Sequence, residues 1–137
     1  MSCKSALYAA MQTPTAVAVG GVIPLGSLIR RYGSDLSLSG SAVNIAGNCQ
    51  SQGYYDVDAS ITATLTAAGT VTATLYKDGV AIPGATASET GTASGTVNLN
   101  ITALVRQACC AAGSALTLVL TGAEATVNNV GLRVQRI

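Results

Sequence analysis

Alternation of apolar and polar residues with a period of two constrains the fold of this chain more than any other feature of its sequence. The clearest run spans residues 55–65, where apolar and polar residues alternate without interruption. Its apolar positions are Tyr55, Val57, Ala59, Ile61, Ala63 and Leu65. Because successive side chains of a strand point to opposite faces, the run predicts a strand with one face in a core and the other in solvent.

The same alternation recurs at residues 71–75, 97–101 and 130–134 and predicts an all-β domain. A short hairpin is expected around residues 39–41, which would place Leu36 and Leu38 opposite Val43 and Ile45. About eight to ten short strands at regular spacing are typical of a sandwich or barrel. A helix is a weaker expectation at residues 5–11 and 102–112, and the Ala/Ser/Thr/Gly-rich stretch 86–96 suggests a flexible loop. At 137 residues the chain fits a single domain.

Two stretches, residues 16–29 and 116–120, are apolar at nearly every position. Strands of this kind are usually covered on both faces. The cover would come either from the rest of the domain or from another subunit. The core itself lacks Phe and Trp, and small side chains each bury little apolar area.

Charge is scarce and nearly balanced, with seven basic and six acidic residues, a net charge of +1 and no histidine. A nucleic-acid surface needs clustered Lys and Arg, so no nucleic-acid partner is expected. The doublet Arg30-Arg31 is interpreted as a solvated strand end. The N-terminal run MSCKSALYAAMQ is too short for a membrane span and poor as a signal sequence, which favours synthesis in the cytoplasm and no membrane partner.

Several phrases together resemble the tumour-necrosis-factor-like (TNF-like) jelly rolls of bacteria and their phages, including the heads of collagen-like exosporium proteins. They are GYYDVDASI at 53–61, VTATLYKDGVAIPGA at 71–85, GSALTLVLTG at 113–122 and NNVGLRVQRI at 128–137. The resemblance covers about the last 85 residues well and the first 50 loosely, with AVAVGGVIPLG as a first strand. It implies a two-sheet, antiparallel jelly-roll sandwich over residues 15–137, preceded by an N-terminal arm at 1–14, and a compact homotrimer.

The resemblance also implies assembly or binding without catalysis. Because no collagen-like stalk precedes the head, the chain is more similar to small proteins encoded among prophage structural genes. The expected function is a structural protein of a virion assembled in the host cytoplasm, as a capsid decoration, head fibre or tail module that contacts other virion proteins. A receptor- or glycan-binding tail module and a spore- or cell-surface protein are the alternatives.

Four cysteines, Cys3, Cys49, Cys109 and Cys110, form the most chemically distinctive group. Their spacing lacks a C-x-x-C pair, and adjacent cysteines rarely present both sulfurs to one tetrahedral metal, so no zinc site is expected. A bridge from Cys49 to either member of the pair would close a loop of about 60 residues, worth roughly 4 kcal/mol in the entropic model. In a cytoplasmic chain free thiols are the default. We therefore expect structural cysteines, reduced or oxidised late.

Asp56 and Asp58 lie two apart on the predicted strand and therefore share a face. In the resembling fold this strand lies beside the C-terminal strand, and Arg133 would share the same face. The resemblance makes this the face that meets neighbouring subunits, with Tyr54, Asp56, Asp58, Val119 and Arg133 as interface candidates. We expect Arg133 to pair with one aspartate, within a subunit or across the interface. A calcium site built from the aspartates and a pair of merely solvated carboxylates remain alternatives.

The remaining charged groups offer little for catalysis. Lys77-Asp78-Gly79 carries an Asp-Gly hairpin signal and is interpreted as the solvated tip of a turn. A cysteine nucleophile would need a base or cation beside it, and Arg106 is the one cation near the cysteine pair in sequence. Asp35 and Glu124 are the acids left for a glycosidase, with few aromatic residues to stack a sugar. No enzyme activity and no cofactor are expected.

Overall fold

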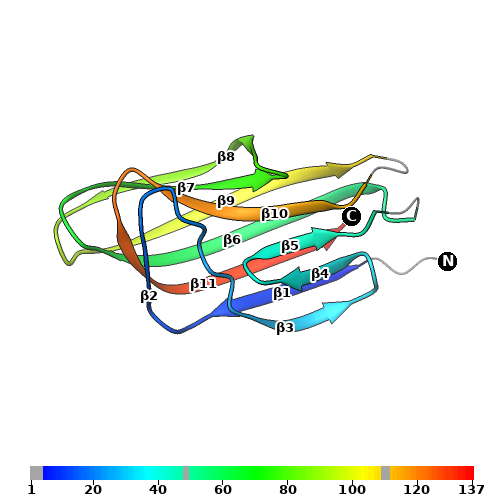
Figure 1. Ribbon diagram of the computed structural model, residues 1–137, viewed down its shortest axis with the longest axis horizontal. Helices are drawn as coiled ribbons and strands as arrows, with labels where there is room; N and C mark the ends of the chain where they lie inside the picture. The colour runs from blue at the N-terminus through cyan, green and yellow to red at the C-terminus, as the bar shows by residue number, and fades with distance from the viewer. Residues whose placement is uncertain (1–4, 48–49, 109–111) are drawn as a thin grey trace.

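The computed structural model describes residues 5–47, 50–108 and 112–137, and these form two antiparallel sheets packed face to face (Figure 1). Sheet A has the order β3 (Ser27–Tyr32), β1 (Ala6–Met11), β11 (Ala125–Arg136), β6 (Gly53–Leu65) and β9 (Thr96–Gln107). The short β2 (Thr15–Val17) pairs with β11. Sheet B has the order β4 (Leu36–Ser39), β5 (Ala42–Ile45), β10 (Ser114–Thr121), β7 (Gly69–Lys77) and β8 (Val80–Gly91). The predicted all-β sandwich is therefore confirmed.

Period-two alternation places the core between the sheets. The six apolar positions predicted for residues 55–65 are all buried in β6, and β10 and β11 alternate in the same way. The predicted hairpin is present, with Leu36 opposite Ile45 and Leu38 opposite Val43. Tyr55 is the one aromatic side chain buried in the described core, which otherwise consists of Ala, Val, Leu, Ile and Met.

The start of the chain departs from the predictions. Residues 6–11, placed in an N-terminal arm and offered as a helix, form β1 inside sheet A, so the sandwich begins well before residue 15. Leu7, Ala9 and Met11 face the core, while Ala6, Tyr8 and Ala10 face outward. Because both faces of this strand are apolar, hydropathy does not show the alternation. The second proposed helix is also wrong, since residues 102–107 belong to β9.

The segments around β8 and β10 also differ from expectation. Most of the predicted flexible loop at 86–96 is strand, with β8 reaching Gly91 and β9 starting at Thr96. On β8, three hydroxyl side chains pair with threonines of β7 across the strands, at 2.7 to 3.0 Å. The stretch 16–29 is no single strand either, because after β2 it leaves sheet A and pairs with β10 of sheet B. There Val22 bridges to Val119, and the Ile23 amide donates to the Leu118 carbonyl at 2.7 Å.

Residues 20–23 lie beside β10 in the plane of sheet B, on the side where β5 ends. Val119 on the outward side of β10 is half-buried, and Val22 is its neighbour across this pairing. Within the described residues, no helix has the length and apolar character required to cross a bilayer.

Candidate functional site

The outward side of sheet A is the most distinctive surface of the molecule. Its exposed apolar side chains gather at the end of the sheet where β6 begins and β11 ends. We call this the aromatic half of the outer face; its large members are Tyr8, Ile29, Tyr32, Tyr54 and Leu104. Toward the other end, the same face carries Ser, Thr and Asn on β6, β9 and β11. The two halves of one sheet face therefore differ in chemistry.

Two shallow grooves cross the aromatic half. One follows β1 and β3 and is lined by Tyr8, Ile29, Arg30, Tyr32 and Gln135, among others. The other runs over β11, β6 and β9 and includes Asp58, Asn100 and Gly131. Tyr8 and Arg133 line both grooves and so form the ridge between them. The Tyr8 ring lies over Gly131, where an added Cβ would be 3.3 Å from the Tyr8 hydroxyl.

Arg133 lies between two carboxylates on this face. It is opposite Asp58 in the β11–β6 register, and its Nη2 contacts Asp58 Oδ2 and lies 3.3 Å from Asp56 Oδ2. Two acids share one base, so the group has a surplus of one negative charge. Among the described residues no cluster of three or more metal-ligating side chains occurs. The Arg133 guanidinium contacts both carboxylates that the calcium alternative would use, and that alternative stays a prediction.

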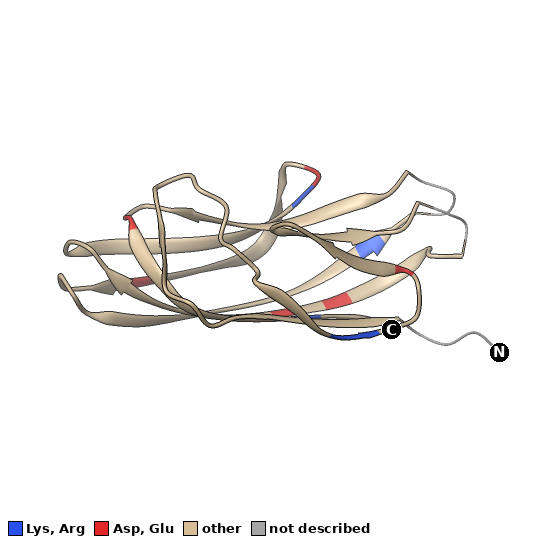
Figure 2. Cartoon of the chain, turned by 60° about the horizontal axis from the view of Figure 1, so that its bottom comes forward, with Lys and Arg blue, Asp and Glu red and all other residues tan. Residues whose placement is uncertain are grey.

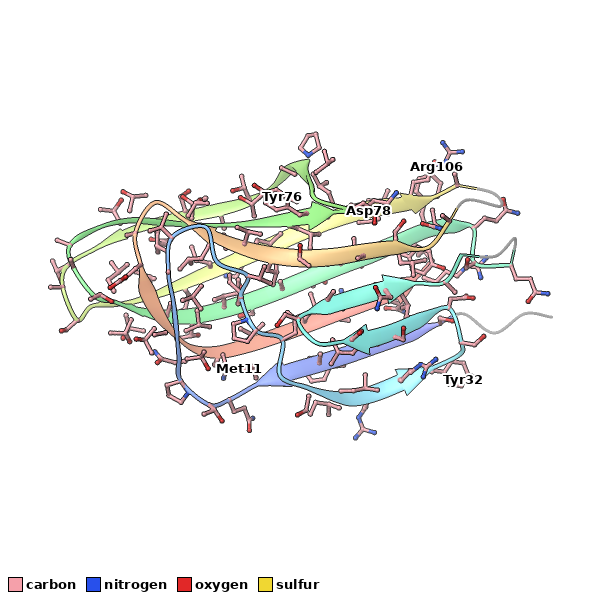
Figure 3. All side chains as sticks on the ribbon, viewed as in Figure 1. Met11, Tyr32, Tyr76, Asp78 and Arg106 are labelled. Atoms are coloured by element: carbon pink, nitrogen blue, oxygen red, sulfur yellow. The ribbon has the colours of Figure 1, made fainter. Side chains whose placement is uncertain are left out.

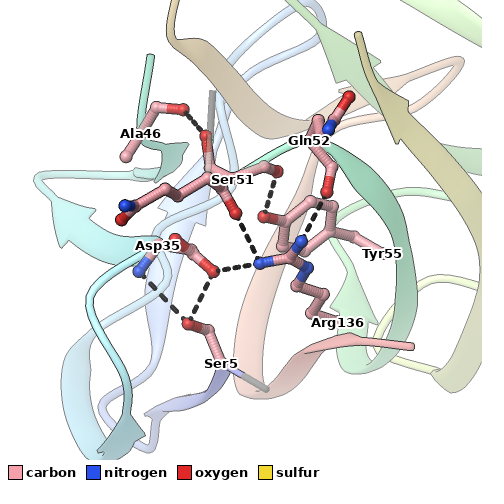
Figure 4. Close-up of polar contacts among 8 residues, drawn as sticks. Ser5, Asp35, Ala46, Ser51, Gln52, Tyr55 and Arg136 are labelled. Carbon is pink, nitrogen blue, oxygen red and sulfur yellow. Dashed lines mark hydrogen bonds and ion pairs between the residues drawn. The ribbon is translucent and has the colours of Figure 1, made fainter. Parts of the chain in front are cut away.

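A second polar cluster closes the same end of the sandwich (Figure 4). Asp35, only 8% exposed, accepts hydrogen bonds from Arg136 Nη1 at 2.9 Å and from the Ser5 hydroxyl at 3.0 Å. Arg136 also donates to the carbonyls of Gln50 and Gln52, at 2.7 and 2.6 Å. Residues 5, 35, 50–52 and 136 are thereby tied together although they are distant in the chain.

Tyr55 lies beside this cluster and donates its hydroxyl to the Ser51 carbonyl at 2.6 Å. Burial raises the pKa of the Tyr55 phenol above its usual value, and the nearby Asp35 carboxylate raises it further, while Arg136 opposes the rise. Asp35, one of the two acids considered for a glycosidase, is thus part of a structural cluster. Glu124 precedes the start of β11, a strand length or about 40 Å from its end. Asp35 and Glu124 therefore cannot flank one glycosidic bond.

The Lys77-Asp78-Gly79 stretch makes the predicted hairpin turn, with positive φ at Asp78 and Gly79. It is not a free tip, however. The Asp78 carboxylate accepts from the Ala115 amide, and the Asp78 amide donates to the Ala115 carbonyl, each at 2.9 Å. Lys77 Nζ donates to the Arg106 carbonyl at 2.7 Å, so the turn is docked on the start of β10 and the end of β9 (Figure 3).

Comparison with solved structures places this architecture in a known class. Murine APRIL superposes with a TM-score of 0.73 at 11% identity, covering 98% of this chain and all of that one. A TNF protein of S. frugiperda, Eiger, gives 0.68 at 12% identity over 97% of this chain and 91% of that one. The fold is the TNF-like jelly roll. No family model matches the sequence, and no curated protein matches it by sequence either.

A third similar structure is the vertex protein P5 of phage PRD1. It superposes with a TM-score of 0.67 at 13% identity, and the alignment covers the whole of this chain and 99% of that chain. At such identities the likeness shows the fold alone. The resemblance inferred from the sequence to the TNF-like jelly roll is confirmed.

The TNF-like sandwich brings together four of the five interface candidates. Tyr54, Asp56, Asp58 and Arg133 all project from the outer face of sheet A. Val119 does not join them, because it lies on β10 in sheet B, beside Val22. That these residues contact another subunit stays a prediction. The four cysteines, Cys3, Cys49, Cys109 and Cys110, lie outside the described residues.

Sequence reasoning missed Tyr8, Tyr32, Leu104 and Arg30 on this face. Leu104 was assigned to a possible helix, and Tyr8 to an arm. A signal was present in the aromatic content, since the chain has only five tyrosines and three of them are exposed here. In a chain without Phe or Trp, tyrosines outside the core point to a contact surface.

Proposed function

We propose that this chain is a non-enzymatic structural protein of a phage or prophage virion that assembles as a homotrimer through the outer face of sheet A. The aromatic half of that face carries the proposal. Tyr8, Tyr32, Tyr54 and Leu104 are 41% to 58% exposed in a chain that buries most other large apolar side chains. Clustered apolar surface of this kind marks an interaction site.

The TNF-like fold supports the trimer, since TNF-like proteins form homotrimers. A closed ring needs two different surface patches on each subunit, because each copy packs head to tail against the next. Sheet A offers such asymmetry, with a groove along β1 and β3 on one side and Leu104 on the β9 edge on the other. Covering these residues would also compensate for a core with one aromatic side chain.

The virion role is supported by the likeness to a phage vertex protein over the full length of both chains. A small, sparsely charged sandwich suits a repeated particle component (Figure 2). Capsid decoration, head fibre and tail module are the positions that we propose, with assembly in the host cytoplasm beside other virion proteins. No step of this function needs a cofactor or a catalytic group.

Particle composition tests the virion role. Particles induced from the source strain would be purified on a density gradient and analysed by quantitative mass spectrometry. We expect this protein in the particle band, and the number of its copies per particle should be a multiple of three. Its absence from particles, with immunogold label on spores or cell surfaces instead, would show that the virion role is wrong and favour the surface-protein alternative.

The exposed tyrosines beside Arg133 and the aspartates favour one other candidate, a receptor- or glycan-binding module. Tyrosine rings stack on sugars, and charged side chains orient their hydroxyl groups. This role would need the aromatic half open to solvent. A glycan array that labels the wild type but not a Tyr8→Ala, Tyr54→Ala variant would support it, and a trimer that buries both residues would contradict it.

A further inference from the structure

The strand β3 forms an open edge of sheet A (Figure 1). One side of it pairs with β1, and within the described residues no strand pairs with the other side. All six of its residues are exposed. At the opposite edge of the sheet, β9 packs against β8 of sheet B and buries alternate residues. The unpaired N–H and C=O groups of an edge strand are a template on which a further strand can pair.

Two arginines give this edge its charge. Arg30 and Arg31 are adjacent and exposed, and neither forms an ion pair within the described residues. Their register partners on β1 are Tyr8 on the outer face and Leu7 on the core side, so the two side chains leave the strand on opposite sides. Both also line the groove along β1 and β3. Positive charge is therefore available on either side of the open edge.

Apolar side chains flank the two arginines along the strand. Leu28, Ile29 and Tyr32 are 41%, 53% and 58% exposed. Ile29 has no register partner on β1, because the pairing shifts by one residue there. Residues that lie directly opposite each other on neighbouring strands share a face and interact. A strand that pairs with this edge is therefore best matched when it carries two adjacent acids between apolar residues.

The matching segment belongs to a different protein. This chain has six acidic residues, and no two of them are adjacent in its sequence. A second copy therefore has no segment in which neighbouring carboxylates could lie opposite Arg30 and Arg31.

We propose that the open edge of β3 binds an extended acidic segment of another virion protein by strand addition. Main-chain hydrogen bonds would hold the segment against β3, and its adjacent carboxylates would accept charge-assisted hydrogen bonds from Arg30 and Arg31. The order apolar, acid, acid, apolar is the same in both chain directions, so it fits a parallel or an antiparallel partner. This inference rests on the proposed function in naming another virion protein as the partner. The edge lies in the plane of the sheet, whereas the proposed trimer uses the outer face.

Fluorescence anisotropy with dye-labelled peptides tests the contact. The probe is acetyl-Thr-Val-Glu-Glu-Val-Thr-amide, and we expect it to bind the wild type at about 0.15 M salt. A matched peptide with Lys-Lys in place of Glu-Glu should bind about tenfold more weakly or less, because its charge is wrong. A second matched peptide with Pro in place of each Val keeps the charge but loses two main-chain donors, and it should also bind more weakly.

Charge reversal in the protein provides the complementary test. Arg30→Glu combined with Arg31→Glu should reverse the preference, so that the lysine peptide binds and the glutamate peptide does not. Arg106→Glu is the matched control, because it makes the same charge change at an exposed position of β9 on the opposite edge of the sheet. It should leave binding of the glutamate peptide unchanged. Circular dichroism checks the fold of each variant.

Hydrogen exchange of the β3 amides, measured by NMR, separates strand addition from charge attraction. Saturating glutamate peptide should slow exchange of the edge-facing amides in residues 27–32, because new main-chain hydrogen bonds protect them. Unchanged exchange in the bound state, or equally good displacement of the peptide by a hyaluronate fragment, would mean that the arginines attract any polyanion and that strand addition is wrong. No binding of the glutamate peptide would also overturn it and leave the arginines as guards against edge pairing.

The same measurements distinguish this inference from the proposed trimer. If the wild type is a trimer and the edge-facing amides are already protected without peptide, a neighbouring copy covers the edge. Strand addition is then wrong and the trimer stands. If the wild type is a monomer that binds the glutamate peptide with protection at β3, the trimer is wrong and strand addition stands.

Discussion

At the scale of single residues, Arg136 joins the end of β11 to two other segments of the chain. It neutralises the buried Asp35 and binds the carbonyls of Gln50 and Gln52. We expect Arg136→Met to lower the free energy of unfolding by about 3 kcal/mol, because a buried carboxylate loses its partner. Adding Asp35→Asn should return part of this loss in urea unfolding. An Arg136→Met variant as stable as the wild type would contradict the role of the cluster.

Tyr55 predicts an alkaline limit to stability. Its pKa is raised in the folded state, so above the ordinary value of 10.0 the unfolded chain loses the phenol proton while the folded chain keeps it. Stability from this group is complete below pH 10 and decreases as the pH rises further. Tyr55→Phe should be about 1 kcal/mol less stable at pH 7, through the lost bond to Ser51, yet show a smaller decrease between pH 10 and 11. Parallel unfolding profiles for both proteins would exclude this explanation.

Asp78 serves two purposes in its turn, since it adopts a φ of 52° and accepts the Ala115 amide. Asp78→Ala should cost about 1–2 kcal/mol in thermal or urea unfolding, because alanine tolerates that φ poorly and accepts no hydrogen bond. Asp78→Asn keeps both properties and should stay near the wild type. Equal losses in the two variants would mean that the lost charge, rather than the turn geometry, matters.

At the scale of elements, the segment between β2 and β3 is held against β1 at Gly26. A Cβ there would lie 2.2 Å from the Ala10 carbonyl oxygen, and φ is +74°. Gly84 has a similar φ of +81° but open space around it. Gly84→Ala should therefore cost only about 1 kcal/mol of backbone strain, whereas Gly26→Ala should cost about 2 kcal/mol more because β1 must move. Similar unfolding midpoints for the two variants would argue against this packing.

The elements also show what sequence patterns can predict. Where one face meets the core and the other meets water, as in β6, the alternation was visible and the strand was predicted. In β1 the outward residues Ala6, Tyr8 and Ala10 are nearly as apolar as the inward ones, so the period was hidden. In β8 the inward positions are small and polar residues dominate, so the strand looked like a loop. Both β1 and β8 form strands because they pair with other strands of their sheets, and this pairing is not visible in the local sequence pattern.

The candidate site was predictable only in part for the same reason. Asp56 and Asp58 share a face by spacing alone, and the resemblance to TNF-like jelly rolls suggested Arg133 beside them. Tyr8 and Arg30 reach that face through β1 and β3, whose position next to β11 depends on the whole topology. Val119 was misplaced because β10 belongs to sheet B through its pairing with β5 and β7, which has no local sequence signal.

At the scale of the whole molecule, we expect the aromatic half of sheet A to join three copies of the chain. Sedimentation equilibrium of the wild type and Leu104→Glu is the test. Val19→Glu, between β2 and the residues that pair with β10, is a control of nearly equal exposure, 56% against 57% for Leu104. We expect three times the 13.6 kDa chain mass for the wild type and Val19→Glu, and the single-chain mass for Leu104→Glu. A monomeric wild type at micromolar concentration, or a Leu104→Glu trimer as tight as the wild type, would contradict it.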